Sequence, residues 1–130
     1  MGYGRVGSRV GQALQQQGVP LNVIDDNDDV VQELAQQGVE AISGSAVTVL
    51  PAANLAQAKC LIVAIPDAIE AGQIVAQARA GNEDLRIITR SHSEAEALHL
   101  KECGASVVVL GAEEIADGIL TRFGRPAATA

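Results

Sequence analysis

The sequence has very few aromatic residues. Phenylalanine, tyrosine and tryptophan together make up 2% of the 130 residues, and tryptophan is absent, whereas 48% of the chain is hydrophobic. The core must therefore be built from Val, Ile, Leu and Ala, the residues that buried parallel strands usually contain. A chain of this length can form one domain with a core of its own.

Positive charge is also scarce. The formal net charge is −7, and the lysines are Lys59 and Lys101. A nucleic-acid surface or a basic membrane-surface segment needs clustered cations, so neither is expected. Cys60 and Cys103 fit neither a disulfide framework nor a zinc pattern, which favours a reducing, cytosolic compartment and no metal. No apolar run approaches the roughly 18 residues of a membrane span.

Glycine, in contrast, is frequent, and the glycines near the start have a known spacing. Gly2, Gly4 and Gly7 form the pattern GxGxxG. The first glycine allows a tight turn, the second lets the backbone approach a phosphate, and the third lets the next helix pack closely on a sheet. The start of that helix would offer unpaired N–H groups to the phosphate. A simple turn is the alternative interpretation of these glycines.

A buried strand should come before such a fingerprint, and here only Met1 does. A trimmed chain, a very short strand or a strand from another chain would each account for this. We expect trimming, so that the printed sequence is part of a longer protein.

Apolar runs and helical patterns alternate along the rest of the chain. The expected strands are 21–24, 39–42, 60–65, 86–90 and 107–110, and the expected helices follow Gly7 and occupy about 30–35, 48–58, 69–80, 93–104 and 112–123. The alternation predicts a doubly wound parallel sheet with helices on both faces, three layers in all. The run 60–65 is apolar on both faces and is expected in the middle of the sheet.

Acidic residues follow the strand 21–24. Asp25 comes about 20 residues after the fingerprint, where a carboxylate accepts hydrogen bonds from ribose hydroxyls. With Asp26 it would repel a 2′-phosphate, which disfavours NADP. The alternative is that residues 25 to 29 are solvating and helix-capping acids, and we expect Asp28 to cap the next helix.

Few residues suit catalysis. His92 follows a strand end and is the better of the two histidines for acid–base work, but no partner is evident at a recognisable spacing. His99 and Cys103 are four residues apart and could share a metal. Two side chains alone are too few ligands for a metal site.

Taken together, these pieces resemble the RCK or TrkA-N domain, the nucleotide-binding regulatory domain of potassium channels and transporters. The matching pieces are residues 2–7, Val23-Ile24-Asp25, Gly44-Ser45-Ala46, Ile65-Pro66-Asp67, Glu70-Ala71 with Ile74-Val75, Ala78-Arg79, and Gly104-Ala105 with Val108-Val109. The stretch from Ile65 to Val75 looks most like the Kef-type potassium/proton antiporters. The resemblance covers nearly the whole chain.

The resemblance implies a single Rossmann-like domain, residues 1–130, that binds AMP or NAD(H) without transforming it. Phosphate would lie on Gly2, Gly4, Arg5 and Val6, ribose on Asp25, and adenine beside Ser45 and Ala46, above Ile65 and Pro66. Many relatives have Asp where Ser45 stands, which leaves base selectivity open. The full implied site is Gly2, Tyr3, Gly4, Arg5, Val6, Asp25, Asp26, Gly44, Ser45, Ala46, Ile65, Pro66 and Arg90.

The resemblance also implies partners. A membrane antiporter would precede the domain in the chain, which places the domain at the cytoplasmic face of the inner membrane. A homodimer would form through the apolar stripe of the last helix, Ile115, Ile119, Leu120 and Phe123. Glutathione control does not carry over, because no motif secures it. Two rival hypotheses are a fragment of an NAD-dependent oxidoreductase and a structural dimerisation domain. The structural domain would leave the glycines and Asp25 unexplained.

Overall fold

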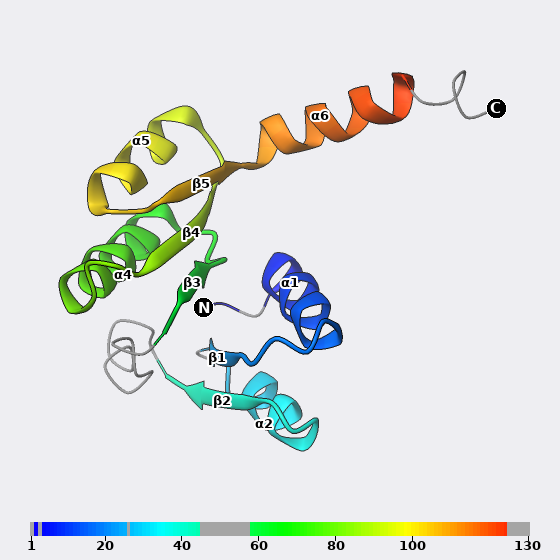
Figure 1. Cartoon of the computed structure of the whole chain (residues 1–130), viewed down its shortest axis with the longest axis vertical. Helices are drawn as coiled ribbons and strands as arrows, with labels where there is room; N and C mark the ends of the chain where they lie inside the picture. Colours follow the sequence, from blue (N-terminus) through cyan, green and yellow to red (C-terminus); the bar gives the residue numbers. More distant parts are fainter. Residues whose placement is uncertain (1, 3, 26, 45–57, 125–130) are drawn as a thin grey trace.

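The structure is a computed structural model that describes residues 2, 4–25, 27–44 and 58–124 (Figure 1). Its elements are α1 (Arg5–Gln16), β1 (Asn22–Asp25), α2 (Asp28–Gln36), β2 (Glu40–Ser43), β3 (Cys60–Val63), α4 (Ala68–Gly81), β4 (Arg86–Ser91), α5 (Glu94–Cys103), β5 (Val107–Leu110) and α6 (Gly111–Gly124). The expected helix 48–58 falls almost wholly outside the described residues. The other expected elements are present.

All strand pairs in the described residues are parallel. β1 pairs with β2, so that Val23 lies opposite Ala41, and β3, β4 and β5 form a second sheet in that order. Figure 1 shows α4 and α5 on one side of the three-stranded sheet and α1 on the other. The predicted parallel architecture with helices on both sides is confirmed.

The expectation that residues 60–65 form a central strand is wrong for the described residues. β3 ends at Val63 and lies at one edge of its sheet, and β4 is in the middle. β4 alternates strictly, with Ile87, Thr89 and Ser91 buried. Leu61 and Val63 belong to the main core and Ile65 packs against it, so one face of the run is buried, whereas Ile62 on the other face is only half-buried.

Helix ends follow from local polar groups. The helix α2 is capped by Asn27, whose side-chain oxygen accepts a hydrogen bond from the Asp29 N–H at 2.9 Å. The expected cap, Asp28, lies one residue inside the helix and accepts instead from the Ser43 hydroxyl. The cap at Ser93 is confirmed, since its hydroxyl oxygen accepts from the Glu96 N–H at 3.2 Å.

Two hydrophobic clusters of unequal size form the core. The main core packs α4 and α5 on the three-stranded sheet. Its buried members are Ile24, Leu61, Val63, Ala71, Ile74, Val75, Ala78, Leu85, Ile87 and Leu100. The small cluster consists of Val23, Leu34 and Val39, which join α2 to the β1–β2 pair. Each fully buried Leu or Ile contributes roughly 1.5–3 kcal/mol, so most of the stabilisation lies in the main core.

The side chain of Arg79 ties three segments of the main core together. Its guanidinium donates hydrogen bonds to the backbone oxygens of Glu83 (2.7 Å), Leu85 (2.6 Å) and Gly104 (2.8 and 3.1 Å). These oxygens belong to the turn after α4 and the end of α5. The rigid fork of arginine suits such a set of acceptors, and lysine could not match it.

The last helix extends away from the rest of the described chain (Figure 1). No residue of α6 is buried. Ile115, Ile119, Leu120 and Phe123 are each exposed, from 63% to 82%. Within the described ranges, every helix is too short or too polar to span a bilayer.

Candidate functional site

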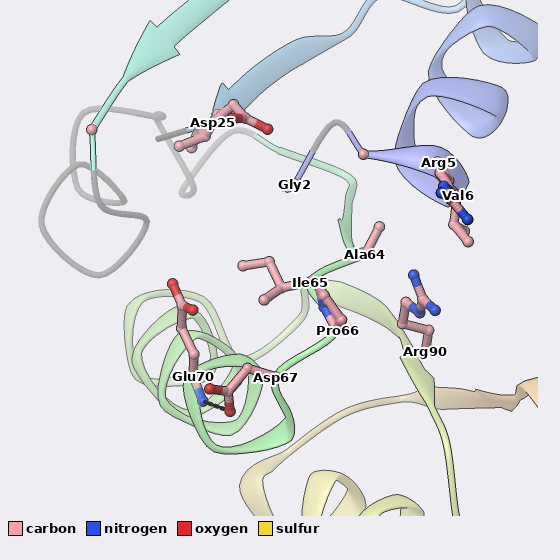
Figure 2. Close-up of a pocket in the computed structure, with 13 residues that line it drawn as sticks. Gly2, Arg5, Val6, Asp25, Ala64, Ile65, Pro66, Asp67, Glu70 and Arg90 are labelled. Atoms are coloured by element: carbon pink, nitrogen blue, oxygen red, sulfur yellow. Dashed lines mark hydrogen bonds between the residues drawn. The ribbon is translucent and has the colours of Figure 1, made fainter. Parts of the chain in front are cut away.

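A pocket of about 580 Å³ lies where the carboxyl ends of β1 and β3 meet the start of α1 (Figure 2). Ligands bind in open α/β sheets at this edge, outside the carboxyl ends of the strands. The pocket is lined by Gly2, Gly4, Arg5, Val6, Ile24, Asp25, Gly44, Ala64, Ile65, Pro66, Asp67, Glu70 and Arg90.

The first glycine of the fingerprint joins the two sheets at this edge. The N–H of Gly2 donates to the carbonyl oxygen of Ile24, at the end of β1, at 3.0 Å. A side chain at position 2 would come within 3.0 Å of Ile65, which follows β3. The φ angle of Gly2 is +83°, a conformation that favours glycine. Both the turn and the close approach therefore require glycine here.

The other two glycines of the fingerprint are needed for different reasons. A Cβ at Gly7 would overlap the carbonyl oxygen of Gly2, so α1 can lie this close only with glycine at that position. A Cβ at Gly4 would meet no atom of the described residues within 4 Å. Gly4 faces the pocket, so its missing side chain leaves room for a ligand rather than for the protein.

The start of α1 is open toward the pocket. Gly4 is its N-cap residue and has no side chain to accept from the first N–H groups, and no acidic residue lies in the first turn. Arg5 is the first helical residue and lines the pocket. Exposed N–H groups and the positive end of the helix dipole make such a terminus favourable for an anion.

Charge is divided between two sides of the pocket, as Figure 2 shows. Arg5 and Arg90 stand on one side, and Asp25 and Glu70 on the other. Ile65 and its apolar neighbours lie between them. A ligand with an anionic part and a separate part rich in hydrogen-bond donors would match this division.

The two carboxylates near α4 differ in their surroundings. Asp67 caps α4, because one of its oxygens accepts from the N–H groups of Ile69 (2.9 Å) and Glu70 (3.3 Å). The carboxylate of Glu70 instead extends toward the pocket (Figure 2).

The carboxylate of Asp25 is held at the end of β1. One of its oxygens accepts a hydrogen bond from the Asn27 N–H at 2.8 Å.

Most of the predicted site residues come together in this pocket. Tyr3, Asp26, Ser45 and Ala46 lie outside the described residues. The predicted residues that line the pocket are Gly2, Gly4, Arg5, Val6, Asp25, Gly44, Ile65, Pro66 and Arg90.

The sequence analysis missed four lining residues, which are Ile24, Ala64, Asp67 and Glu70. Asp67 and Glu70 come just after a strand end, and that position was the available signal for them.

The candidates for catalysis and metal binding are not assembled in the pocket. His92 is not among the residues that line it, and its Nδ1 atom lies 3.8 Å from Glu96, a partner that the sequence analysis did not name. Cys103 lies 3.8 Å from His99. The described residues contain no group of three metal-ligating side chains.

The Cys60 thiol is not activated as a nucleophile. Burial raises the pKa of the Cys60 thiol, although the positive charge of Arg86 opposes the rise. The thiol is therefore protonated at neutral pH, and it is not among the residues that line the pocket.

A family model for the TrkA-N domain matches residues 1–111 of this chain. The chain belongs to the TrkA-N domain family. The expected family resemblance is thereby confirmed.

The inner membrane protein YbaL is a similar protein. The sequence named "Putative cation/proton antiporter YbaL" from Escherichia coli (strain K12) is 44% identical over 130 residues, which cover 98% of this chain and 23% of that protein. The crystal structure of its TrkA-N domain has a TM-score of 0.89 at 45% identity, covering 92% of this chain and 90% of the other.

Two Kef proteins are also similar. The C-terminal domain of Kef from Shewanella denitrificans, solved in an AMP-bound form, has a TM-score of 0.78 at 26% identity and covers 98% of this chain and 80% of that one. The glutathione-regulated potassium-efflux protein KefC of Enterobacter sp. (strain 638) is 30% identical over 105 residues, 79% of this chain and 17% of that protein. The chain thus spans less than a quarter of the full length of YbaL and of KefC.

Proposed function

We propose that this chain is a cytosolic regulatory domain that binds an adenine nucleotide, AMP or NAD(H), and controls a potassium/proton antiporter to which it is joined at the inner membrane. The observation that carries the proposal is the pocket in which the GxGxxG turn, Asp25 and two arginines face one space. The AMP-bound form of the similar Kef domain supports the choice of ligand.

The phosphate would lie over Gly4, at the open start of α1. Arg5 and Arg90 would supply positive charge from one side, and the first N–H groups of α1 would donate hydrogen bonds. Because a Cβ at Gly4 would meet no atom of the described residues within 4 Å, a phosphate oxygen can come close to the backbone there.

The ribose and the base would lie toward the acidic side. Asp25 would accept hydrogen bonds from the ribose hydroxyls. Ile65 and Pro66 would form the floor, and Gly44 would leave room for the base beyond the end of β2. Glu70 adds a second carboxylate on this side, and both would repel a 2′-phosphate, which makes NADP a poor ligand.

The domain is proposed to regulate and not to catalyse. The described residues that line the pocket include no histidine and no cysteine that could serve as base or nucleophile. Binding would shift the populations of two arrangements of a homodimer, in which α6 contributes Ile119 and its apolar neighbours to the interface. A ligand shifts such a balance only by its difference in affinity for the two states.

Calorimetric titration with AMP, NAD, NADH, ATP and NADP tests the proposal, together with the substitution Gly4→Ala. We expect AMP or NAD(H) to bind, and Gly4→Ala to weaken that binding by roughly tenfold or more, equivalent to about 1.4 kcal/mol. The reason is that the new methyl group would occupy the space of the phosphate, while meeting no atom of the described residues within 4 Å.

Gly124→Ala is the matched control, because position 124 is also open and lies at the far end of α6. It should bind like the unmodified protein. Failure of every adenine nucleotide to bind would refute the proposal. Turnover of a nicotinamide cofactor would instead support an oxidoreductase.

A further inference from the structure

A chain of side-chain contacts leads from the pocket to the surface. Arg90, which lines the pocket, places its Nη2 atom 3.5 Å from the Nε2 atom of His92. The other ring nitrogen of His92, Nδ1, lies 3.8 Å from the Glu96 carboxylate. The His92 backbone N–H also donates to that carboxylate at 3.3 Å. His92 therefore stands between a pocket cation and a carboxylate on α5.

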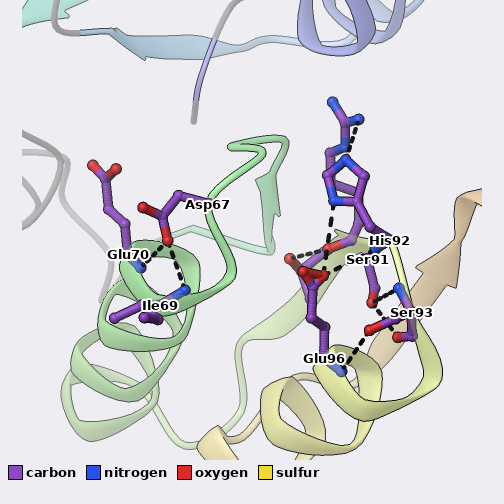
Figure 3. A network of polar contacts seen from close by, with 9 residues as sticks. Asp67, Ile69, Glu70, Ser91, His92, Ser93 and Glu96 are labelled. Carbon is purple, nitrogen blue, oxygen red and sulfur yellow. Dashed lines mark hydrogen bonds and ion pairs between the residues drawn. The ribbon is translucent and has the colours of Figure 1, made fainter.

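The loop that holds His92 is fixed on both sides (Figure 3). The buried hydroxyl of Ser91 donates to the Ser93 carbonyl oxygen at 2.7 Å and accepts from the Ser93 N–H at 3.3 Å. Ser93 in turn caps α5 through the Glu96 N–H. Because both neighbours of His92 are held, its ring has a defined place relative to Arg90 and Glu96.

Other charged groups lie on the elements around this loop, but only Arg90 and Glu96 are in contact with the His92 ring among the described residues. β5 carries no charge. The remaining acids near the starts of α4, α5 and α6 are Asp67, Glu70, Glu94, Glu113 and Glu114.

We propose that His92 and Glu96 are positioning residues for Arg90 and make the affinity of the pocket for an anionic nucleotide depend on pH. This inference rests on the proposed function, because it assigns Arg90 to the phosphate. Histidine is the side chain that ordinarily changes charge between pH 5 and 8.

The direction of the effect follows from the two ring nitrogens. In neutral His92, Nδ1–H would point to Glu96, and Nε2 would accept from Arg90 and so engage one nitrogen of the guanidinium that lines the pocket. When His92 is protonated, Nε2 no longer accepts, and the imidazolium repels Arg90 while Glu96 retains the ring. Arg90 is then available to the phosphate, so the nucleotide binds more tightly at low pH.

The test is the affinity for NAD, measured calorimetrically at pH 5.5 and pH 8. NAD is the probe because its diphosphate does not titrate in this range. The affinity should be roughly two- to fivefold higher at pH 5.5, the size expected for exposed charge pairs. His92→Gln should remove the pH dependence, and His92→Lys should give the high affinity at both pH values.

Matched controls are available in the same chain. His99 is the other of its two histidines, so His99→Gln should keep the full pH dependence. Glu96→Gln should change the pH dependence, because the protonated ring of His92 loses the carboxylate that retains it, whereas Glu94→Gln should not. Retention of the pH dependence in His92→Gln, or its loss in His99→Gln, would overturn the inference.

A measurement without nucleotide separates this inference from the proposed function. The side-chain Nε–H signal of Arg90 in NMR spectra of the free protein should follow the ionisation of His92 and lose that response in His92→Gln. An Arg90 signal that ignores His92 refutes the positioning role, even if NAD binds. A failure of NAD and of every other adenine nucleotide to bind, while the Arg90 signal responds, refutes only the nucleotide assignment.

Discussion

The two parts of the molecule that meet at the pocket differ in how they are held together. The thin half, α1 to β2, has a two-stranded sheet and the small cluster around Leu34. The thick half, β3 to β5 with α4 and α5, has a three-stranded sheet, the main core and the Arg79 hydrogen bonds. The fingerprint and Asp25 are in the thin half, whereas the pocket floor and Arg90 are in the thick half. A ligand that bridges the pocket would therefore stabilise mainly the thin half.

The largest expected effect comes from one substitution made in both halves. Leu100 in the main core and Leu34 in the small cluster are both buried, at 0% and 3% exposure. Leu100→Ala should lower the free energy of unfolding by about 4 kcal/mol, and Leu34→Ala by about 2 kcal/mol, because a small cluster can close around the missing atoms. Chemical denaturation measures both. Equal losses of unfolding free energy in the two variants would contradict the proposed difference in packing between the halves.

The next effect concerns Arg79 alone. Arg79→Lys should cost about 2 kcal/mol, because an ammonium cannot reach all the carbonyl oxygens that the guanidinium serves and leaves some of them unpaired. Arg122→Lys is the control, since within residues 58–124 Arg122 makes one exposed hydrogen bond, to Gly118. The same denaturation experiment should find it within about 0.5 kcal/mol of the unmodified protein. A similar cost for both arginines would show that the Arg79 hydrogen bonds do not stabilise the thick half more than one exposed hydrogen bond stabilises α6.

The smallest effect on stability is expected outside both halves, on α6. Ile119→Asp should change the free energy of unfolding of the monomer by less than about 0.5 kcal/mol, because Ile119 is 63% exposed. It should nevertheless shift the protein toward monomer in sedimentation, because a charge would enter the proposed dimer interface. Glu114→Gln on the same helix serves as the control. An unchanged mass for Ile119→Asp would argue against that interface.

The sequence predicted the architecture well where each signal is local. Apolar runs and glycines determine where strands and helices begin, and Gly2, Gly4 and Gly7 each have a local reason that the structure makes explicit. The cap of α2 was wrong by one residue, because Asn27 and Asp28 are both able caps and only the backbone decides between them.

Other features depend on the closure of the fold and have no local signal. Glu70 reaches the pocket because the start of α4 and the end of β1 face the same space, not because of its spacing from the fingerprint. The acceptors of Arg79 are 3 to 27 residues away in the chain, and nothing in their sequence indicates an arginine partner.

The glycines at positions 4 and 7 also differ in what they allow a protein engineer to do. Position 7 accepts no side chain, since its space is filled by the backbone of Gly2. Position 4 is open, so side chains of increasing volume could be introduced there to narrow the entrance stepwise on an intact scaffold. The same short motif thus contains one site at which ligand preference can be redesigned and another that any redesign must leave unchanged.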